Sequence, residues 1–227
     1  MIEFDDLGKR YDTGYEALRK ITFHMDAGEM AFLTGRSGAG KSTLLKLLML
    51  MERPTSGNIL INGTNLNLLR RQQIPTYRRQ LGVVFQNHRL LMDRTLYENV
   101  SLPLQVSGYP RDEMARRVRA ALDSVGLLDR EQFKPAELSG GEQQRVGIAR
   151  AIVHKPKILL ADEPTGNLDP QLSAEIMALF RRFQTVGVTV LIATHDVSLI
   201  NRMRLRILRL DGGGLAEDSG KREQEKE

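Results

Sequence analysis

A glycine-rich segment between an apolar run and a helical pattern constrains the fold of this chain more than any other feature. Residues 35–43 read GRSGAGKST; residues 30–33 before them are apolar, and residues 41–51 have the spacing of a helix. Glycines allow successive amide N–H groups to point at one anion, and the beginning of the helix adds its positive dipole end. A turn that only caps a helix would explain the glycines but not the lysine, serine and threonine that follow. The segment therefore predicts a phosphate-binding loop in an α/β protein.

Each residue of this loop has a predicted task. Lys41 supplies a point charge for the β- and γ-phosphate oxygens of a nucleotide, and the hydroxyl group of Ser42 is placed to bind Mg²⁺. Thr43 can form a hydrogen bond with a phosphate oxygen. The remaining residues of the loop are expected to surround the phosphates: Gly35, Arg36, Ser37, Gly38, Ala39 and Gly40.

Short apolar runs alternate with helical patterns along much of the chain, which predicts a largely parallel α/β sheet. Strands are expected at residues 21–25, 30–33, 59–61, 83–85, 157–161 and 188–193. The last two are continuous apolar runs, as in central strands that are covered on both faces. We assign residues 1–86 and 152–212 to this nucleotide-binding core.

The middle of the chain, residues 87–151, is predicted to be a helical insertion into the core. Within it, residues 111–125 place apolar side chains on one face at helical spacing. That face comprises Met114, Val118, Ala121, Leu122 and Val125. The arginines of this helix lie elsewhere, and we interpret them as a solvated surface. No aromatic residues interleave with them, so binding of nucleic acid is not expected.

The end of the chain carries two further patterns. Arg202, Arg204 and Arg206 alternate with apolar residues, which predicts a half-buried edge strand with its arginines facing outward. Residues 213–227 have mixed charge, and we expect a flexible tail there.

Two adjacent carboxylates follow one of the central apolar runs. Residues 158–163 read ILLADE, so Asp162 and Glu163 lie at the carboxyl end of a buried strand, where α/β proteins bind ligands. We predict that Asp162 holds Mg²⁺ through water and that Glu163 is the general base, or positions the water, for hydrolysis. Adjacent acids before Pro164 can also simply cap a turn, an interpretation that the complete phosphate loop upstream disfavours.

Gln86 and His195 follow two other predicted strands. The neutral amide of Gln86 can contact Mg²⁺ or orient water without adding charge. His195 can donate a hydrogen bond to a γ-phosphate and hold Glu163 in place. A lone glutamine or histidine is usually structural, so both predictions depend on the rest of the set. The predicted catalytic residues are therefore Glu163, His195 and Gln86, and the predicted metal ligands are Ser42, Gln86 and Asp162.

A second glycine-rich segment raises a different question. LSGGEQQR, residues 138–145, has a hydroxyl residue and two glycines before a helical pattern but no lysine. Ser139 and the backbone of Gly140 and Gly141 would make only half of an anion site.

The composition sets outer limits on the function. The absence of cysteine excludes disulfides and cysteine-ligated zinc and fits a cytosolic protein. No run approaches the ~18 to 20 apolar residues of a membrane span, and the acidic start MIEFDDLGKR is unlike a secretory signal. A net charge of +5 suits contact with nucleotides, nucleic acid or an anionic membrane surface and does not choose among them.

In kind and in order, these motifs resemble the nucleotide-binding subunits of ATP-binding-cassette (ABC) proteins. The resemblance rests on GRSGAGKST, Gln86, LSGGEQQR, ILLADEP, GNLD and His195, and it covers nearly the whole chain. It implies a Mg²⁺-dependent ATPase that forms a single domain over residues 1–227. It also implies a P-loop NTPase (RecA-like) parallel-sheet core with an antiparallel β subdomain and an α-helical subdomain. The family signature is LSGGQ, and here Glu142 stands in place of the glutamine.

The resemblance also implies how the half site is completed. In this family two subunits stack head to tail, and each ATP lies between the phosphate loop of one subunit and the signature of the other. We therefore expect a homodimer held by ATP, in which Ser139, Gly140, Gly141 and Glu142 contact the nucleotide of the partner.

Two more assignments depend on the resemblance. The turn from Asn167 to Asp169 is similar to the D-loop of the family, which runs along the dimer seam, so Asp169 is a candidate nucleotide contact. The family places an aromatic ring on the adenine just after the first strand. Tyr11 fits this role, and Tyr15 is the competing candidate.

Longer segments narrow the resemblance to one branch of the family. FHMDAGEMAFLTGRSGAGKSTLLKL and HRLLMDRTLYENVSLPL are most similar to the ATPases of bacterial cell division, which pair with the membrane protein FtsX. This implies a subunit on the cytoplasmic face of the inner membrane, at the division septum, that drives a conformational change controlling cell-wall hydrolases. An energy-coupling ATPase of a lipoprotein, lipid or drug transporter is the alternative. A soluble ABC module that acts on nucleic acid is disfavoured, because such proteins usually carry two cassettes in one chain.

A membrane partner needs a docking surface. Between Asn87 and Arg94, the apolar residues Leu90, Leu91 and Met92 would form a small dock for a helix of that partner if they are exposed. Packing inside the helical insertion is the alternative.

Overall fold

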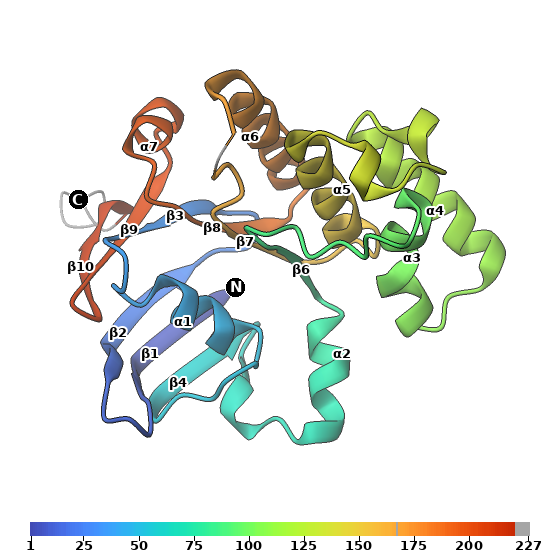
Figure 1. Ribbon diagram of the computed structural model, residues 1–227. Helices are drawn as coiled ribbons and strands as arrows, with labels where there is room; N and C mark the ends of the chain where they lie inside the picture. The colour runs from blue at the N-terminus through green and yellow to red at the C-terminus, as the bar shows by residue number, and fades with distance from the viewer. Residues whose placement is uncertain (167, 221–227) are drawn as a thin grey trace. The chain divides into compact units, whose positions relative to one another are not determined.

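The computed structural model describes residues 1–166 and 168–220 (Figure 1). The chain divides into two compact units. The first comprises Met1–Arg78 and the chain from Thr189 onward, and the second comprises Arg79–Val188. The helical insertion predicted for residues 87–151 falls entirely within the second unit.

The first unit contains an antiparallel sheet with the strand order β2-β1-β4-β5. Its strands are β1 (Ile2–Arg10), β2 (Glu16–Met25), β4 (Ser56–Ile61) and β5 (Thr64–Asn65). Ile2, Phe4 and Leu7 of β1 are buried, with the alternation shifted at an irregularity between Phe4 and Leu7. Phe4 stacks on Phe23 of β2 with ring centroids 4.5 Å apart. One apolar face on a sheet of this kind matches the antiparallel β subdomain that was expected.

The same unit contains the parallel strands that carry the phosphate loop. β3 (Met30–Thr34) lies between β8 (Thr189–Ala193) and β9 (Arg206–Asp211) and runs parallel to both. Every residue of β3 and β8 is buried, as expected of continuous apolar runs. The helices of this unit are α1 (Lys41–Leu48), α2 (Ile74–Arg78) and α7 (Val197–Met203), with 3-10 turns at Leu66–Leu68 and Arg71–Gln73.

The edge strand predicted from the alternating arginines is wrong. Arg202 belongs to α7, and Arg204, with φ 49°, caps the end of that helix. β9 begins only at Arg206 and is flanked by β3 and β10 (Gly214–Asp218), so it is not an edge. The side chain of Arg206 is 13% exposed because it pairs with Glu29 and Asp218, each at 2.8 Å. Its charge is thus satisfied inside the unit rather than by water.

The flexible tail predicted from residue 213 is also wrong in its first part. β10 pairs antiparallel with β9, and Gly212 and Gly213, both with positive φ, make the turn between them. The glycines that suggested flexibility therefore form a hairpin turn. The rest of the predicted tail, from residue 221, lies outside the described residues.

In its described residues, the second unit combines two parallel strands with four helices. β6 (Leu81–Val84) pairs with β7 (Ile158–Asp162). The helices are α3 (Leu96–Val106), α4 (Arg111–Ser124), α5 (Gly140–Ile152) and α6 (Pro170–Thr185), with 3-10 turns η3 (Leu128–Arg130) and η4 (Pro135–Glu137). α3, α4 and α5 pack on one another, and Val118, Ala121 and Leu122 on the predicted face of α4 are buried. Residues 96–152 of this unit are therefore largely helical.

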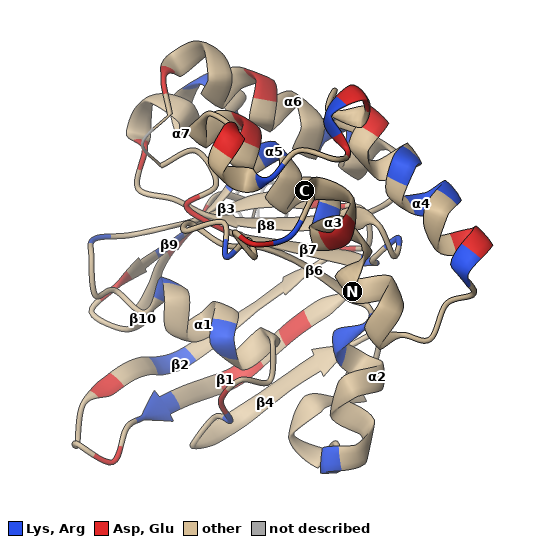
Figure 2. Ribbon diagram, turned by 45° about the vertical axis from the view of Figure 1, so that its right-hand side comes forward, with Lys and Arg blue, Asp and Glu red and all other residues tan. Residues whose placement is uncertain are grey.

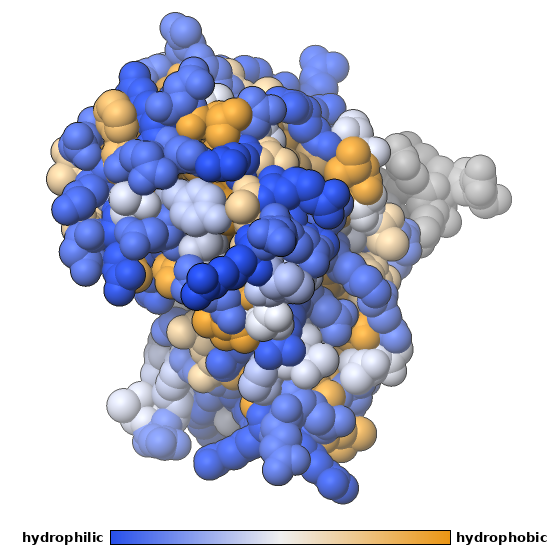
Figure 3. All heavy atoms as spheres, turned by 90° about the vertical axis from the view of Figure 1, so that its right-hand side faces the viewer, coloured by the Kyte–Doolittle hydropathy of each residue, from blue (hydrophilic) through white to orange (hydrophobic). Residues whose placement is uncertain are grey.

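Two of the four arginines of α4 form ion pairs with acidic side chains. Figure 2 shows basic and acidic residues interleaved along this helix. Arg117 lies 2.7 Å from Glu113, and Arg119 lies 3.0 Å from Glu131. On the face drawn in Figure 3, hydrophobic residues form separate spots among hydrophilic ones. Among the described helices, none combines the length and the apolar character that a membrane crossing needs.

Candidate active site

The phosphate loop leaves β3 with a backbone that requires glycine at several positions. Gly35, Gly38 and Gly40 have φ values of 141°, 79° and 106°, a region that other residues rarely adopt. A Cβ atom on Gly40 would lie 2.6 Å from the carbonyl oxygen of Ala17, and one on Gly35 would overlap the carbonyl oxygen of Leu210. Two of the three glycines are therefore fixed both by backbone conformation and by lack of space.

Lys41 reaches back over this loop. Its Nζ donates hydrogen bonds to the carbonyl oxygens of Gly35 at 2.7 Å and Arg36 at 3.2 Å. The first turn of α1 contains no acidic residue, and Ser42 lies in this turn. A positive charge and the N-terminal end of a helix thus lie together where an anion would bind.

Both candidate tyrosines contact the phosphate loop or the helix behind it. The hydroxyl group of Tyr11 lies 3.3 Å from Oγ1 of Thr43 and donates to Glu52 at 3.1 Å. The hydroxyl group of Tyr15 donates to the carbonyl oxygen of Gly38 at 3.0 Å. The two rings are nearly parallel, with centroids 6.4 Å apart. These contacts do not exclude either ring from stacking on adenine, and Tyr15 is the more exposed of the two.

His195 follows β8, the parallel neighbour of β3. Leu33 of β3 is in register with Ala193 of β8, and the amide of Thr194 donates to the carbonyl oxygen of Leu33 at 3.1 Å. Because the carboxyl ends of parallel strands meet at one edge, His195 and the phosphate loop begin at the same edge. His195 is exposed there.

Asp196 anchors the turn that carries His195. Its Oδ1 accepts hydrogen bonds from the hydroxyl group of Ser198 at 2.7 Å and the amide of Leu199 at 3.0 Å. These two bonds, the Ser198 bond first, lower the pKa of Asp196. An ionised carboxylate at this position caps the start of α7, directly after His195.

In the second unit, Gln86 and the two acids follow neighbouring strands and lie at the same edge of the sheet. β6 and β7 are parallel, with Val84 in register with Ala161. The amide of Gly166 donates to the carbonyl oxygen of Glu163 at 3.1 Å, which closes a turn after the strand. A Cβ atom on Gly166 would lie 3.7 Å from Nε2 of Gln86. The Gln86 amide therefore lies beside the turn that begins at Glu163.

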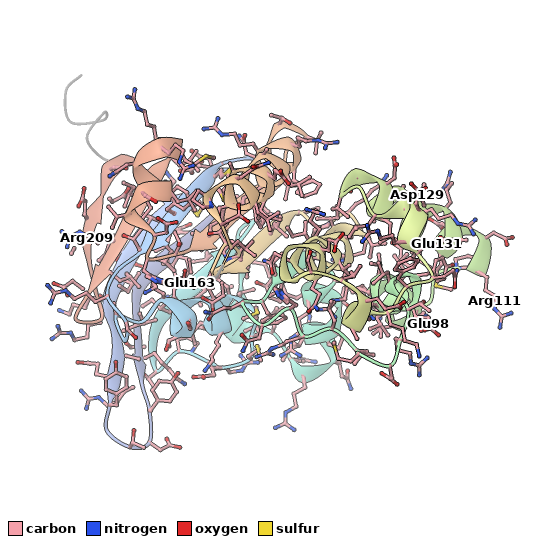
Figure 4. All side chains as sticks on the ribbon, turned by 45° about the horizontal axis from the view of Figure 1, so that its top comes forward. Glu98, Arg111, Asp129, Glu131, Glu163 and Arg209 are labelled. Carbon is pink, nitrogen blue, oxygen red and sulfur yellow. The ribbon has the colours of Figure 1, made fainter. Side chains whose placement is uncertain are left out.

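Glu163, labelled in Figure 4, has an unusual backbone. Its φ is 48°, in the left-handed region. For a residue other than glycine this conformation costs on the order of 1–3 kcal/mol and is concentrated at functional sites. The sequence pattern did not predict this conformation, which Glu163 shares with other described residues such as Leu50 and Lys155.

The second glycine-rich segment forms the beginning of α5. Ser139 is the N-cap of this helix, and its hydroxyl oxygen accepts from the amide of Glu142 at 3.4 Å. A Cβ atom on Gly141 would overlap the side chain of Leu172, whereas Gly140 has open space around it. The helix start at Ser139 and Gly140 is exposed, and the segment from Leu138 to Arg145 contains no lysine.

Asp169 has a structural task. Its Oδ1 accepts hydrogen bonds from the amides of Gln171 at 3.0 Å and Leu172 at 2.9 Å, which makes it the N-cap of α6. The structure thus gives this carboxylate a helix-capping role. Asn167, the other end of the predicted D-loop turn, lies outside the described residues.

Two residues that sequence reasoning missed hold the segment after Gln86. Asn99 is fully buried, and its Nδ2 donates to the carbonyl oxygens of Leu91 at 2.9 Å and Thr95 at 3.0 Å. Arg150 donates to the carbonyl oxygen of Arg89 at 2.7 Å, and burial lowers the pKa of Arg150. In the sequence, the position of Asn99 among apolar residues of a helix is a signal of its structural role, and we find no such signal for Arg150.

The hydrogen bonds from Asn99 and Arg150 hold the backbone of the predicted docking segment, Asn87 to Arg94, but part of the segment is still exposed. Leu91 is 43% exposed and Met92 is 51% exposed, whereas Leu90 is half-buried. Leu91 and Met92 therefore do not pack inside the helical insertion.

The predicted metal ligands are divided between the units. Ser42 lies in the first unit, and Gln86 and Asp162 lie in the second. A hydroxyl, an amide and a carboxylate supply the oxygen atoms that Mg²⁺ prefers. Over residues 1–166 and 168–220, no group of three or more His, Cys, Asp or Glu side chains could hold a metal ion.

Comparison with known proteins gives consistent matches. The family model described as "ABC transporter" matches residues 18–166. Over 215 residues the chain is 58% identical to the cell division ATP-binding protein FtsE of Escherichia coli K12, covering 95% of this chain and 97% of that protein. It is 51% identical over 216 residues to FtsE of Haemophilus influenzae, covering 95% of this chain and 99% of that protein.

A solved structure matches as well. It is described as the dimeric structure of a post-hydrolysis state of the ATP-binding cassette MJ0796 bound to ADP and Pi. The TM-score is 0.87 at 34% identity, and the match covers 96% of this chain and 98% of that chain. This likeness confirms the fold class expected from the sequence.

Proposed function

The chain belongs to the ABC transporter family, and from this premise we propose that it is the ATP-hydrolysing subunit that drives a membrane partner during bacterial cell division. The cell-division role is supported by the FtsE proteins of several bacteria, which are 44% to 58% identical over nearly the whole chain. These relatives do not favour the alternative, an energy-coupling ATPase of a lipoprotein, lipid or drug transporter.

One observation carries the mechanism. The same chain holds a complete phosphate loop with Lys41 and a second helix start, at Ser139, that lacks any lysine. Half of an anion site is useful when a second copy brings the anion, and the similar cassette bound to ADP and Pi is a dimer. We therefore infer that two copies stack head to tail, each with its signature against the nucleotide of the other. Residues 87–151 form the helical subdomain that presents this signature.

Each residue of the site then has a separate role in ATP binding and hydrolysis. The phosphate loop and Lys41 bind the β- and γ-phosphates, and the ring of Tyr11 stacks on adenine. Ser42, Gln86 and Asp162 are the residues that would hold Mg²⁺, Asp162 through water; when bound, the ion neutralises phosphate charge. Glu163 takes the proton of the attacking water, and His195 donates a hydrogen bond to the γ-phosphate.

The proposed partner is an integral membrane protein of the FtsX kind. It docks on the segment between Asn87 and Arg94, where Leu91 and Met92 are exposed. Such a contact places the chain on the cytoplasmic face of the inner membrane at the division septum. Because Gln86 directly precedes this segment, the arrangement links the γ-phosphate to the docking surface.

The experiment that tests this function uses Glu163→Gln. Losing a general base costs about 10²- to 10⁴-fold in rate, while the bound ATP remains. The variant should bind ATP and accumulate as a dimer in sedimentation velocity with ATP and Mg²⁺. A variant that stays monomeric at saturating ATP would refute the head-to-tail site, and wild-type turnover would refute the role of Glu163.

A further inference from the structure

A carboxylate lies at the helix end that, in the proposed function, receives a phosphate group. Glu142 is the third residue of α5, and its Oε2 accepts hydrogen bonds from the amide of Ser139 at 2.9 Å and from its hydroxyl group at 2.8 Å. Two anionic groups at one helix start repel each other. A neutral glutamine, as in LSGGQ, would avoid this repulsion. The departure at Glu142 therefore needs compensation.

Arg130 lies where it can provide this compensation. Its NH1 atom is 2.6 Å from Oε1 of Glu142, the oxygen that Ser139 does not use. The Glu142 side chain is only 18% exposed, and that of Arg130 is 45% exposed. The guanidinium carbon of Arg130 also lies 5.8 Å above the ring of Phe133. Both carboxylate oxygens thus have partners, and the arginine is held from two sides.

The surroundings keep Glu142 ionised. The hydrogen bond from the Ser139 amide, followed by that from its hydroxyl group, lowers the pKa of Glu142, and the charges of Arg130 and Arg145 act in the same direction. Arg145 is shared, since its NH1 atom lies 3.7 Å from Glu175. Arg130 is therefore the closer counter-charge for this carboxylate.

We propose that Arg130 is a positioning residue for the nucleotide carried by a second copy of this chain. Its charge cancels that of Glu142, and its hydrogen bond keeps the carboxylate turned toward Ser139, so that the start of α5 stays favourable to a phosphate. This inference rests on the proposed ATP-bound dimer. Arg130 should therefore affect dimer formation and not the binding of ATP to a single copy, because the phosphate loop alone holds ATP there.

The test combines charge removal with charge rescue. Arg130→Met keeps the aliphatic stem and removes the charge. In the Glu163→Gln background it should raise the dimer dissociation constant with ATP by roughly tenfold, the size of one uncompensated charge near an anion. Binding of a fluorescent ATP analogue to single copies should not change. Adding Glu142→Gln should return the dissociation constant to within about twofold of that for Glu142→Gln alone, because no charge is left to cancel.

The matched control is Arg119→Met. It removes another exposed arginine of the same unit from an ion pair, with Glu131 (labelled in Figure 4) at 3.0 Å, and dimerisation should stay at the parent level. Equal behaviour of the two arginine variants, or no rescue by Glu142→Gln, would overturn the role of Arg130 while the dimer itself stands. A parent protein that never dimerises with ATP would instead overturn the proposed function, and this inference with it.

Discussion

Nζ of Lys41 lies 2.7 Å from the carbonyl oxygen of Gly35, so the lysine of the phosphate loop is bound to the backbone of the loop itself. A nucleotide must replace this contact by charge-assisted bonds to phosphate oxygens, which contribute about 1.5–3 kcal/mol each. Lys41→Met should therefore weaken ATP binding on the order of 10²-fold, measured by titration with a fluorescent analogue. Lys46→Met, on the same helix but paired with Glu52 at 3.6 Å, is the control and should change affinity less than about twofold. Equal losses would contradict the assignment.

The two glycines of the signature should differ in their tolerance of a side chain. A Cβ atom on Gly141 would overlap Leu172, so Gly141→Ala should lower the free energy of unfolding by about 1–3 kcal/mol, as overpacking does. Gly140→Ala meets nothing within 4 Å and should leave stability within about 0.5 kcal/mol of wild type. Chemical denaturation measures both. In a double-mutant cycle, Leu172→Ala should relieve part of the cost of Gly141→Ala; strictly additive effects would show that the overlap is not the cause.

Adenine stacking can be assigned to one of the two tyrosines. Tyr11→Ala removes the ring and should weaken ATP binding by about 1–3 kcal/mol, the usual size of stacking between a base and an aromatic side chain. Tyr11→Phe keeps the ring and loses only the hydroxyl bonds near Thr43 and Glu52, so its affinity should stay near wild type. Tyr15→Ala should have the smaller effect. The reverse order of the two alanine variants would transfer the stacking role to Tyr15.

Much of the fold was predictable because its signals are local. The buried strands β3, β7 and β8 are continuous apolar runs. The phosphate loop is recognisable from its glycines and lysine within nine residues. The alternating arginines led to a wrong prediction of an exposed edge strand, because Arg206 forms an ion pair with Glu29, which lies 177 residues away in the sequence. Pairing at such separation leaves no trace in a single sequence.

For the candidate site, the sequence proposes residues but does not give their conformations or pairings. Strand ends located Gln86, Asp162, Glu163 and His195. Glu163 has a left-handed conformation at the start of the turn closed by the Gly166 amide, and residue propensities do not predict such a conformation. The pairing of Arg130 with Glu142 depends on how the chain folds between η3 and α5, and appears only when both are placed in space.

The docking segment gives the last prediction. Leu91→Asp places a charge on a side chain that is 43% exposed, so it should leave folding and ATP hydrolysis by the isolated protein intact. An apolar dock that must bury this position would lose its membrane partner, because an unpaired buried charge costs several kcal/mol. Purification of the tagged chain from solubilised membranes, with mass spectrometry of the bound proteins, checks the loss. Val106→Asp, at a side chain of the same unit that is 77% exposed, is the matched control and should retain the partner. Retention of the partner by both variants would show that the docking surface does not include Leu91, and loss by both would indicate a broader contact that extends to the end of α3.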